Sequence, residues 1–233
     1  RDIPFYGLME NKIEGVDIVI SQTGFTGEKG YEIYVRDAHQ NAEIVWNSVL
    51  EAGEEFGLQV VAPAHHRRIA AGILSWGQDM DFETSPFQVN LSYQVPRNKQ
   101  ADYIGKEELE RQRAIIDGGD FPFKMRMVGL IFGGKQITDY APDFWLIADA
   151  DGNDMGYITS PWWSPELNTN IALGWMPTSS SETGTKLQVR LPDEYSESSG
   201  VPAEGEIVDV PFRESVNPNI REVAKAKGLD YAE

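Results

Sequence analysis

Six short strand-like segments in the second half of the chain constrain its fold more than any other feature. They follow a break at residues 117–120, which read DGGD. Each combines apolar or β-branched residues with turn residues at its ends. The segments are residues 125–132, 143–149, 155–159, 170–176, 186–191 and 206–212. Short strands separated by turn signals, including a hairpin-type Asp151-Gly152, predict a small antiparallel barrel or sandwich.

The residues before the break mix strands and helices. Residues 16–21 and 31–35 have strand patterns and are separated by a loop with three glycines, so we expect a long-looped hairpin. Apolar residues then recur at helical spacing from Asp37, a candidate N-cap, to about Phe56, where Gly57 could end the helix. Further segments are expected as follows: a helix over residues 63–74, a long ordered loop over 76–98, a charged helix over 105–116 and a short terminal helix over 217–227.

These patterns predict an α+β chain in three parts. Residues 1–120 form the mixed part, residues 121–212 the antiparallel β-barrel and residues 213–233 a helical tail. The chain begins at Arg1 without an initiator methionine and without an apolar signal segment, and its motifs favour a fragment.

Charge and composition exclude several classes of function. The net charge is −17, and such a surface repels phosphate backbones and anionic lipids, so we expect no nucleic-acid or membrane partner. The chain has no cysteine, which rules out disulfides, thiol nucleophiles and cysteine-ligated metals within it. We expect a cytoplasmic protein.

The residues by themselves supply no complete catalytic constellation. His65 and His66 are adjacent, so on a helix their side chains point about 100° apart and share a metal poorly. We therefore expect no metal site. The serines lack the context of a nucleophile elbow, and the glycines of residues 24–30 are not followed by a helix, which excludes a dinucleotide fingerprint.

Three motifs in order do carry a resemblance. Residues 23–33 read TGFTGEKGYEI, residues 68–80 read RIAAGILSWGQDM, and residues 156–174 run from GYITS to NIALG. With Ser85-Pro86 and the closing VPF of residues 210–212, they are similar to the motifs of the glycine-cleavage T-protein family, which includes a dimethylsulfoniopropionate demethylase. The agreement in order and spacing extends from about Val16 to Phe212.

The resemblance implies a folate-binding fold and two site residues. Residues 1–120 would be the C-terminal part of the folate-binding aminomethyltransferase domain, and the family's catalytic aspartate is expected upstream of Arg1. Glu32 matches the glutamate that binds the pterin ring, and a carboxylate can accept paired N–H bonds from such an edge. Arg68 matches the family's site arginine, whose planar fork suits a carbonyl or carboxylate.

The sequence departs from the family pattern in ways that bear on the one-carbon donor. Ala70 replaces a usual glutamate, and Trp162 and Trp163 stand where T-proteins have small residues. Tryptophan faces attract onium cations, so we expect Trp162 and Trp163 to help bind an ammonium or sulfonium donor. The alternative for both is packing within the barrel or a contact with another domain.

The expected function is a tetrahydrofolate-dependent one-carbon transfer. A methyl or aminomethylene group would pass from a small amine or onium donor to tetrahydrofolate, with a carrier protein as a further candidate partner. Alternatives are a folate module of a larger dimethylglycine- or sarcosine-type oxidase, a non-catalytic folate-binding protein and a β-rich interaction module. The sequence does not distinguish the donor.

Overall fold

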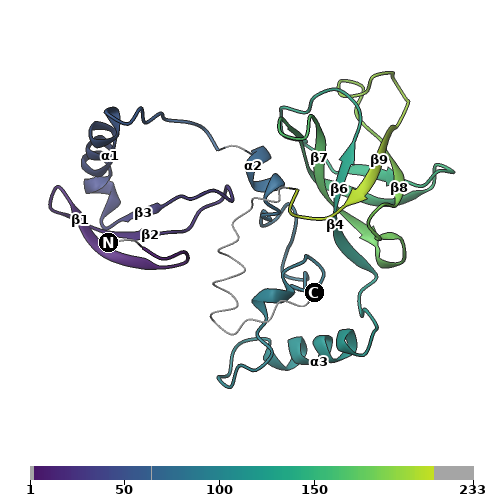
Figure 1. Ribbon diagram of the computed structural model, residues 1–233, viewed down its shortest axis with the longest axis horizontal. Helices are drawn as coiled ribbons and strands as arrows, with labels where there is room; N and C mark the ends of the chain where they lie inside the picture. The colour runs from purple at the N-terminus through teal and green to yellow at the C-terminus, as the bar shows by residue number, and fades with distance from the viewer. Residues whose placement is uncertain (1–2, 64, 213–233) are drawn as a thin grey trace. The chain divides into compact units, whose positions relative to one another are not determined.

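In the computed structural model, which describes residues 3–63 and 65–212, the chain forms two compact units (Figure 1). The first comprises residues 1–64 and the second residues 65–233. The sequence-predicted limits at residues 120 and 212 remain predictions, and the helix expected over residues 217–227 lies outside the described residues.

The first unit is a three-stranded antiparallel sheet with one helix against it (Figure 1). Its elements are β1 (Leu8–Ile13), β2 (Val16–Ser21), β3 (Glu32–Val35) and α1 (Ala38–Glu54). The buried side chains Val16 and Ile18 alternate along β2 and pack against Val45 of α1. The predicted hairpin of β2 and β3 is confirmed, with Ser21 opposite Glu32.

Strand β1 was not expected from its sequence, LMENKI. It contains three polar residues in a row and one β-branched residue, so its intrinsic strand preference is weak. Tertiary context overrides that preference: Glu14 and Gly15 both have positive φ, at 47° and 79°, which is the conformation of a tight hairpin turn. The turn returns the chain along the free edge of β2, and all six residues of β1 find partners.

Helix α1 ends where the sequence indicates. Gly57 has φ 71°, and the backbone N–H of Leu58 donates to the carbonyl of Gly53. A left-handed residue just after the last turn is most easily glycine, because other residues carry a Cβ that crowds the following carbonyl. At the other end Asp37 is the N-cap residue, although its side chain makes no capping hydrogen bond.

The second unit is a closed barrel of six antiparallel strands preceded by short helices (Figure 1). The helices are α2 (His65–Ala70), η1 (Ser92–Gln94) and α3 (Lys106–Asp117), and η2 (Thr178–Ser180) lies within the barrel sequence. The strands are β4 (Met125–Phe132), β5 (Trp145–Ala148), β6 (Asp154–Ser164), β7 (Thr169–Pro177), β8 (Lys186–Val189) and β9 (Ala203–Val208). Their order is β4-β7-β6-β5-β8-β9, with β9 pairing back to β4. The prediction left barrel and sandwich open, and the structure is a barrel.

Two hydrophobic clusters use opposite faces of the barrel wall. One contains Leu130, Ile147, Ile158 and Val189, and each of these is at most 1% exposed. The other lies on the opposite face of β4 and β7, where Met127, Ile171 and Leu173 pack against Ile69 of α2. Burying each such aliphatic side chain stabilises the folded state by about 1.5–3 kcal/mol relative to leaving it exposed. This second cluster fixes α2 on the barrel.

Several predicted elements differ from the structure at their ends, and the strand expected over residues 155–159 continues as β6 to Ser164. The helix expected over residues 63–74 stops at Ala70, because Gly72 takes φ 69° and the N–H of Ile73 donates back to the carbonyl of Arg68. The strand expected over residues 206–212 instead spans Ala203–Val208, and the chain then leaves the barrel so that the N–H of Phe212 donates to the carbonyl of Ala70.

The glycine at position 156 permits close packing of β6 on β7. A Cβ built there would lie 2.1 Å from the carbonyl oxygen of Trp175 and 2.8 Å from Sδ of Met176. We expect Gly156→Ala to lower the free energy of unfolding by about 1–3 kcal/mol through overpacking. Urea denaturation would measure it. Gly152→Ser, at a turn whose Cβ direction is open, isolates the strain of a positive φ alone, and an equal loss in both variants would argue against the overpacking.

Candidate functional site

Arg68 lies at the centre of a buried polar cluster that joins α2 to the barrel. Its side chain is 1% exposed and pairs with the equally buried Asp79, with Nη1 2.8 Å from Oδ2. It also donates hydrogen bonds to the Ile73 carbonyl at 3.0 Å, Gln78 Oε1 at 3.4 Å, Ser160 Oγ at 2.8 Å and His65 Nδ1 at 3.0 Å. These five bonds match the five N–H groups of a guanidinium.

The carboxylate of Asp79 accepts several hydrogen bonds besides the ion pair, just as the guanidinium of Arg68 donates several. Its Oδ2 also accepts the backbone N–H of Ser75 at 2.8 Å, and its Oδ1 accepts the hydroxyls of Thr159 and Ser160 at 2.5 and 2.6 Å. Its backbone carbonyl accepts the indole N–H of Trp175. A buried ion pair is tolerated only when such additional bonds satisfy the remaining lone pairs and protons.

This geometry bears on the role predicted for Arg68. Its fork faces protein acceptors from α2, from residues 73–79 and from β6, so a ligand would reach the guanidinium by displacing one of them. Direct contact between Arg68 and the cofactor stays a prediction. What the structure gives Arg68 is a positioning role, in which it holds three segments of the second unit together.

His65 connects this cluster to a group of aromatic rings. Its ring is stacked on Trp162, with centroids 5.4 Å apart, and meets Tyr140 edge-on at 4.0 Å. Tyr140 and Trp162 are 5.8 Å apart at 84°. We call these three residues the aromatic triad. Burial lowers the pKa of His65, the charge of Arg68 lowers it further, and Asp79 opposes both.

Trp163 faces away from the aromatic triad. Successive side chains of a strand point to opposite faces, and both tryptophans lie in a regular stretch of β6, opposite Ile171 and Asn170. Trp162 packs with the cluster against α2, on the face that carries the triad. The structure therefore brings Trp162, but not Trp163, together with Arg68 through His65.

Glu32 lies in the first unit, as the first residue of β3, and is exposed. Its Oε2 accepts hydrogen bonds from the hydroxyls of Thr23 and Tyr34. The hydroxyl of Thr23 is in turn 2.9 Å from that of Ser21. Within residues 3–63 and 65–212, Oε1 accepts no hydrogen bond. The carboxylate is thus oriented by the hydrogen bonds to Oε2, and Oε1 is available to accept hydrogen bonds from a ligand.

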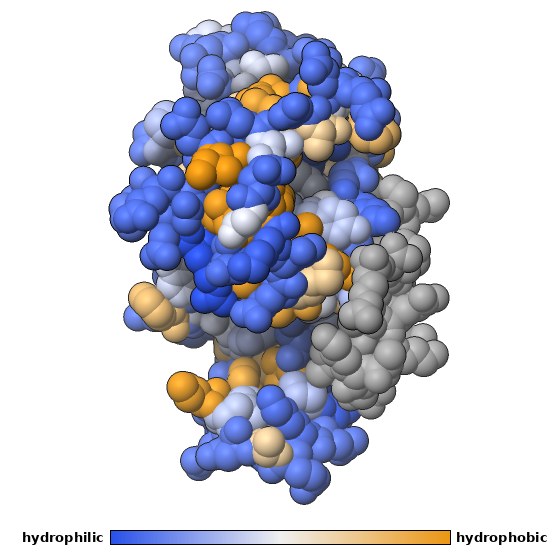
Figure 2. Space-filling model, turned by 90° about the vertical axis from the view of Figure 1, so that its left-hand side faces the viewer, coloured by the Kyte–Doolittle hydropathy of each residue, from blue (hydrophilic) through white to orange (hydrophobic). Residues whose placement is uncertain are grey.

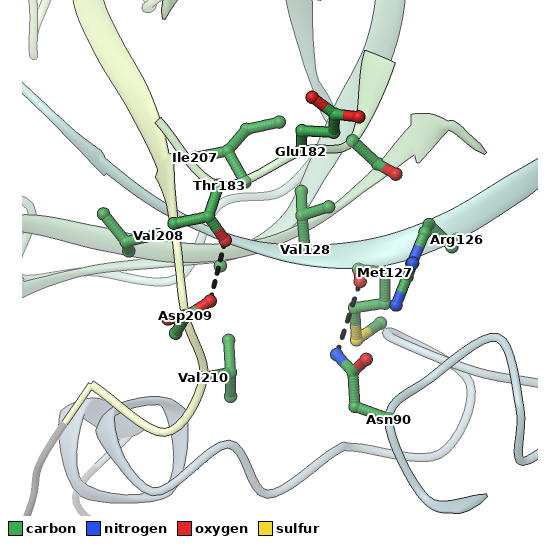
Figure 3. A pocket seen from close by; sticks show the side chains of 12 residues that line it. Asn90, Arg126, Met127, Val128, Glu182, Thr183, Ile207, Val208, Asp209 and Val210 are labelled. Atoms are coloured by element: carbon green, nitrogen blue, oxygen red, sulfur yellow. Dashed lines mark hydrogen bonds between the residues drawn. The ribbon is translucent and has the colours of Figure 1, made fainter. Parts of the chain in front are cut away.

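A separate cavity of about 260 Å³ lies beside the first residues of β4 and the end of β9 (Figure 3). Figure 3 shows Thr183 donating to Asp209 at 2.7 Å on one side and Asn90 donating to the carbonyl of Met127 at 3.4 Å on another. Arg126 enters from β4, and its guanidinium lies 5.1 Å from the ring centroid of Phe121. Glu32, Arg68, Trp162 and Trp163 do not line this cavity.

The face seen in Figure 2 is predominantly hydrophilic, with separate hydrophobic patches, as a chain with net charge −17 would present. Among residues 3–63 and 65–212, no three His, Asp or Glu side chains are grouped so that they could hold a metal ion. Over the same residues, no helix combines the length and apolarity needed to span a bilayer.

Two family models match the chain in succession. The model of the GCVT N-terminal domain covers residues 1–99, and that of the glycine cleavage T-protein C-terminal barrel domain covers residues 126–212. The chain belongs to the glycine cleavage T-protein family. The barrel predicted from the strand pattern is thus this family's C-terminal barrel, and residues 1–99 belong to its N-terminal domain.

Relatives within the T-protein family come from both of the groups that the motifs indicate. The dimethylsulfoniopropionate demethylase of Ruegeria pomeroyi is 30% identical over 202 residues, covering 83% of this chain and 50% of the relative. The aminomethyltransferase of a Geobacillus species is 31% identical, covering 81% and 50%, and that of a Synechococcus species is 33% identical, covering 81% and 48%. The chain therefore spans about half the length of the curated relatives it matches.

A solved T-protein shares the fold. The crystal structure of the glycine cleavage system aminomethyltransferase T from Bartonella henselae superposes with a TM-score of 0.70 over 91% of this chain and 54% of the other, at 23% identity. At that identity the likeness concerns the fold.

Sequence reasoning missed several members of the site. Two of the matched motifs contain Asp79 and the pair Thr159 and Ser160, respectively. Their presence in motifs of one family was a signal that the two segments contact each other. For His65 the sequence suggests only the question of a metal ligand. Tyr140 lies between predicted strands and carries no local signal, so only the fold could bring it to Trp162.

Proposed function

We propose that the protein to which this chain belongs is a tetrahydrofolate-dependent one-carbon transferase. It moves a methyl or aminomethylene group from a small amine or onium donor to tetrahydrofolate. Membership of the T-protein family supports the proposal, as do relatives named as aminomethyltransferases and as a dimethylsulfoniopropionate demethylase. The proposed partners are the small-molecule donor and a carrier protein.

The observation that carries the proposal is the open carboxylate of Glu32 within the TGFTGEKGYEI motif. Thr23 and Tyr34 fix one oxygen, and the other is available to N–H groups of the pterin edge. Such charge-assisted bonds are roughly twice as strong as neutral ones. The residues of the first unit therefore fit the ring that folate would place there.

The contribution of this chain to the reaction is alignment. Bound tetrahydrofolate supplies the nitrogen that accepts the one-carbon unit and loses its proton. Glu32 orients the ring that carries this nitrogen, and catalysis by orientation can account for several kcal/mol of a barrier, up to about 7–11. The resemblance leaves proton removal to an aspartate upstream of Arg1. Arg68 remains a proposed cofactor residue through its effect on the position of α2.

Isothermal titration of tetrahydrofolate into the intact protein tests the proposal, followed by assays of one-carbon transfer. Dimethylsulfoniopropionate, N,N-dimethylglycine and an aminomethylated carrier protein are the donors to compare. Binding and transfer from one of the donors are expected. An intact protein that binds no tetrahydrofolate would overturn the proposal.

We expect Trp162→Ala to weaken binding of an onium donor by about 2- to 30-fold, because a tryptophan face attracts an onium cation by about 0.5–2 kcal/mol. Trp163→Ala tests the other predicted contact. Since the two side chains face opposite sides of β6, a small donor contacts at most one of them. Trp46→Ala, on exposed α1, is the control, and equal donor affinity in all three variants would remove the tryptophans from the site.

A further inference from the structure

The ring of His65 in the second unit has two nitrogens, and Arg68 contacts only Nδ1. Arg68 Nε donates to His65 Nδ1 at 3.0 Å, so Nδ1 must hold a lone pair, and the proton of the neutral ring sits on Nε2. Within the described residues 3–63 and 65–212, Nε2 has no hydrogen-bond partner. The ring is therefore fixed in one tautomer with its donor uncommitted.

Several features keep this imidazole neutral. A proton on Nδ1 would oppose the N–H of Arg68 Nε, placing two donors and two cations 3.0 Å apart. Among residues 3–63 and 65–212, the charges that act on the ring are Arg68 of the same helix and Asp79 of the following segment, and the rings packed on it are Trp162 of β6 and Tyr140 of the segment before β5. Burial and Arg68 both lower the pKa of His65.

We propose that His65 is a ligand-binding residue of the one-carbon donor site. Its Nε2–H donates to a carboxylate or carbonyl oxygen of the donor, while the donor's methylated onium group lies against Trp162 and Tyr140. The proposal rests on the transferase function proposed above. Arg68 is the positioning residue, because its bond to Nδ1 selects the tautomer.

The chemistry of the triad selects this class of ligand. A guanidinium that donates to Nδ1 polarises the imidazole and strengthens the Nε2–H as a donor, since linked hydrogen bonds reinforce one another. An anionic oxygen is the acceptor that gains most from this. The neighbouring aromatic faces favour a cation or methyl groups. A small molecule that carries both, such as an onium carboxylate, fits the pair of contacts.

Nitrogen-15 labelling of histidine tests the tautomer without any ligand. The chain has three histidines, so substitution of each assigns the spectrum. We expect His65 to show the neutral Nε2–H pattern from pH 8 down to below the usual histidine range, and Arg68→Lys to abolish that preference. A ring that exchanges freely between tautomers, or that is protonated at pH 7, would overturn the proposal.

Donor titration tests the binding role. With dimethylsulfoniopropionate or N,N-dimethylglycine as probe, the Nε2–H resonance of His65 should move on saturation. His65→Phe keeps a ring but no donor and should weaken donor binding by about tenfold or more, as for loss of a hydrogen bond to a charged group. His65→Gln keeps an N–H and should recover part of the affinity. His39→Gln, on exposed α1, is the control.

The outcomes separate this inference from the proposed function. If the wild-type protein binds tetrahydrofolate and transfers from a donor, while His65→Phe binds that donor normally, only the assignment of His65 fails. If the wild-type protein binds neither molecule, the proposed function fails and the assignment fails with it. An Nε2–H resonance that stays fixed at donor saturation also overturns the assignment, even if the His65→Phe variant does not fold.

Discussion

Replacing Arg68 by alanine is expected to lower the free energy of unfolding of the second unit by about 3–5 kcal/mol, because the change leaves a buried charge without its partner. Asp79 would keep its two hydroxyl donors and the N–H of Ser75, but lose the cation 2.8 Å away. Urea denaturation followed by tryptophan fluorescence would measure the loss, since Trp162 and Trp175 both lie in this unit.

Arg67→Ala is the matched control for that change. Arg67 is the preceding residue of α2, has the same side chain and is exposed, so its removal should change stability by less than about 0.5 kcal/mol. Replacing both members of the buried pair, with Arg68→Met and Asp79→Leu, should recover part of the stability. A single Arg68→Ala variant as stable as the control would contradict the central role of the ion pair.

Glu32→Gln is expected to weaken tetrahydrofolate binding by about 10- to 150-fold, which corresponds to the loss of hydrogen bonds to a charged group worth about 1.5–3 kcal/mol. The amide retains the size of the side chain and one acceptor oxygen, but it lacks the charge and the second acceptor. Isothermal titration calorimetry of the wild-type and variant proteins would measure the difference.

The controls for Glu32→Gln address orientation and charge separately. Thr23→Val removes the hydroxyl that fixes Oε2 and should give a smaller loss, because the carboxylate remains. Glu51→Gln removes an equal charge from exposed α1 and should leave binding unchanged. Equal tetrahydrofolate affinity in the wild-type protein and the Glu32→Gln variant would show that this carboxylate does not bind the pterin ring.

The motifs point to particular residues, but they do not give the partners that each side chain has in the fold. Glu32 is expected from the motif to bind the pterin ring; the structure places it as the first residue of β3 with Oε2 hydrogen-bonded, and its contact with the ring stays a prediction. Arg68 was expected to face a ligand, but its N–H groups face five acceptors of the protein. Side-chain partners more than 80 positions away, such as Ser160, cannot be deduced from local pattern.

Strand β1 and helix α2 show the same limit at the level of backbone. β1 has weak intrinsic preference and forms because the Glu14-Gly15 turn delivers it to β2. α2 was expected to be longer, and it stops because Gly72 adopts a left-handed conformation. A Cβ at Gly72 would lie 2.4 Å from Val210, a contact that only the folded barrel creates.

The sequence by itself determined the antiparallel β-rich second half, the hairpin of β2 and β3, and the position of Glu32, because strand periodicity, turn residues and motif order are local properties. Only the tertiary structure decided that the strands close into a barrel, that Arg68 pairs with Asp79 between α2 and the barrel, and that His65 meets Tyr140 and Trp162. The physical reason is that burial and ion pairing depend on which segments, distant in sequence, pack against one another. That packing exists only once the barrel has closed.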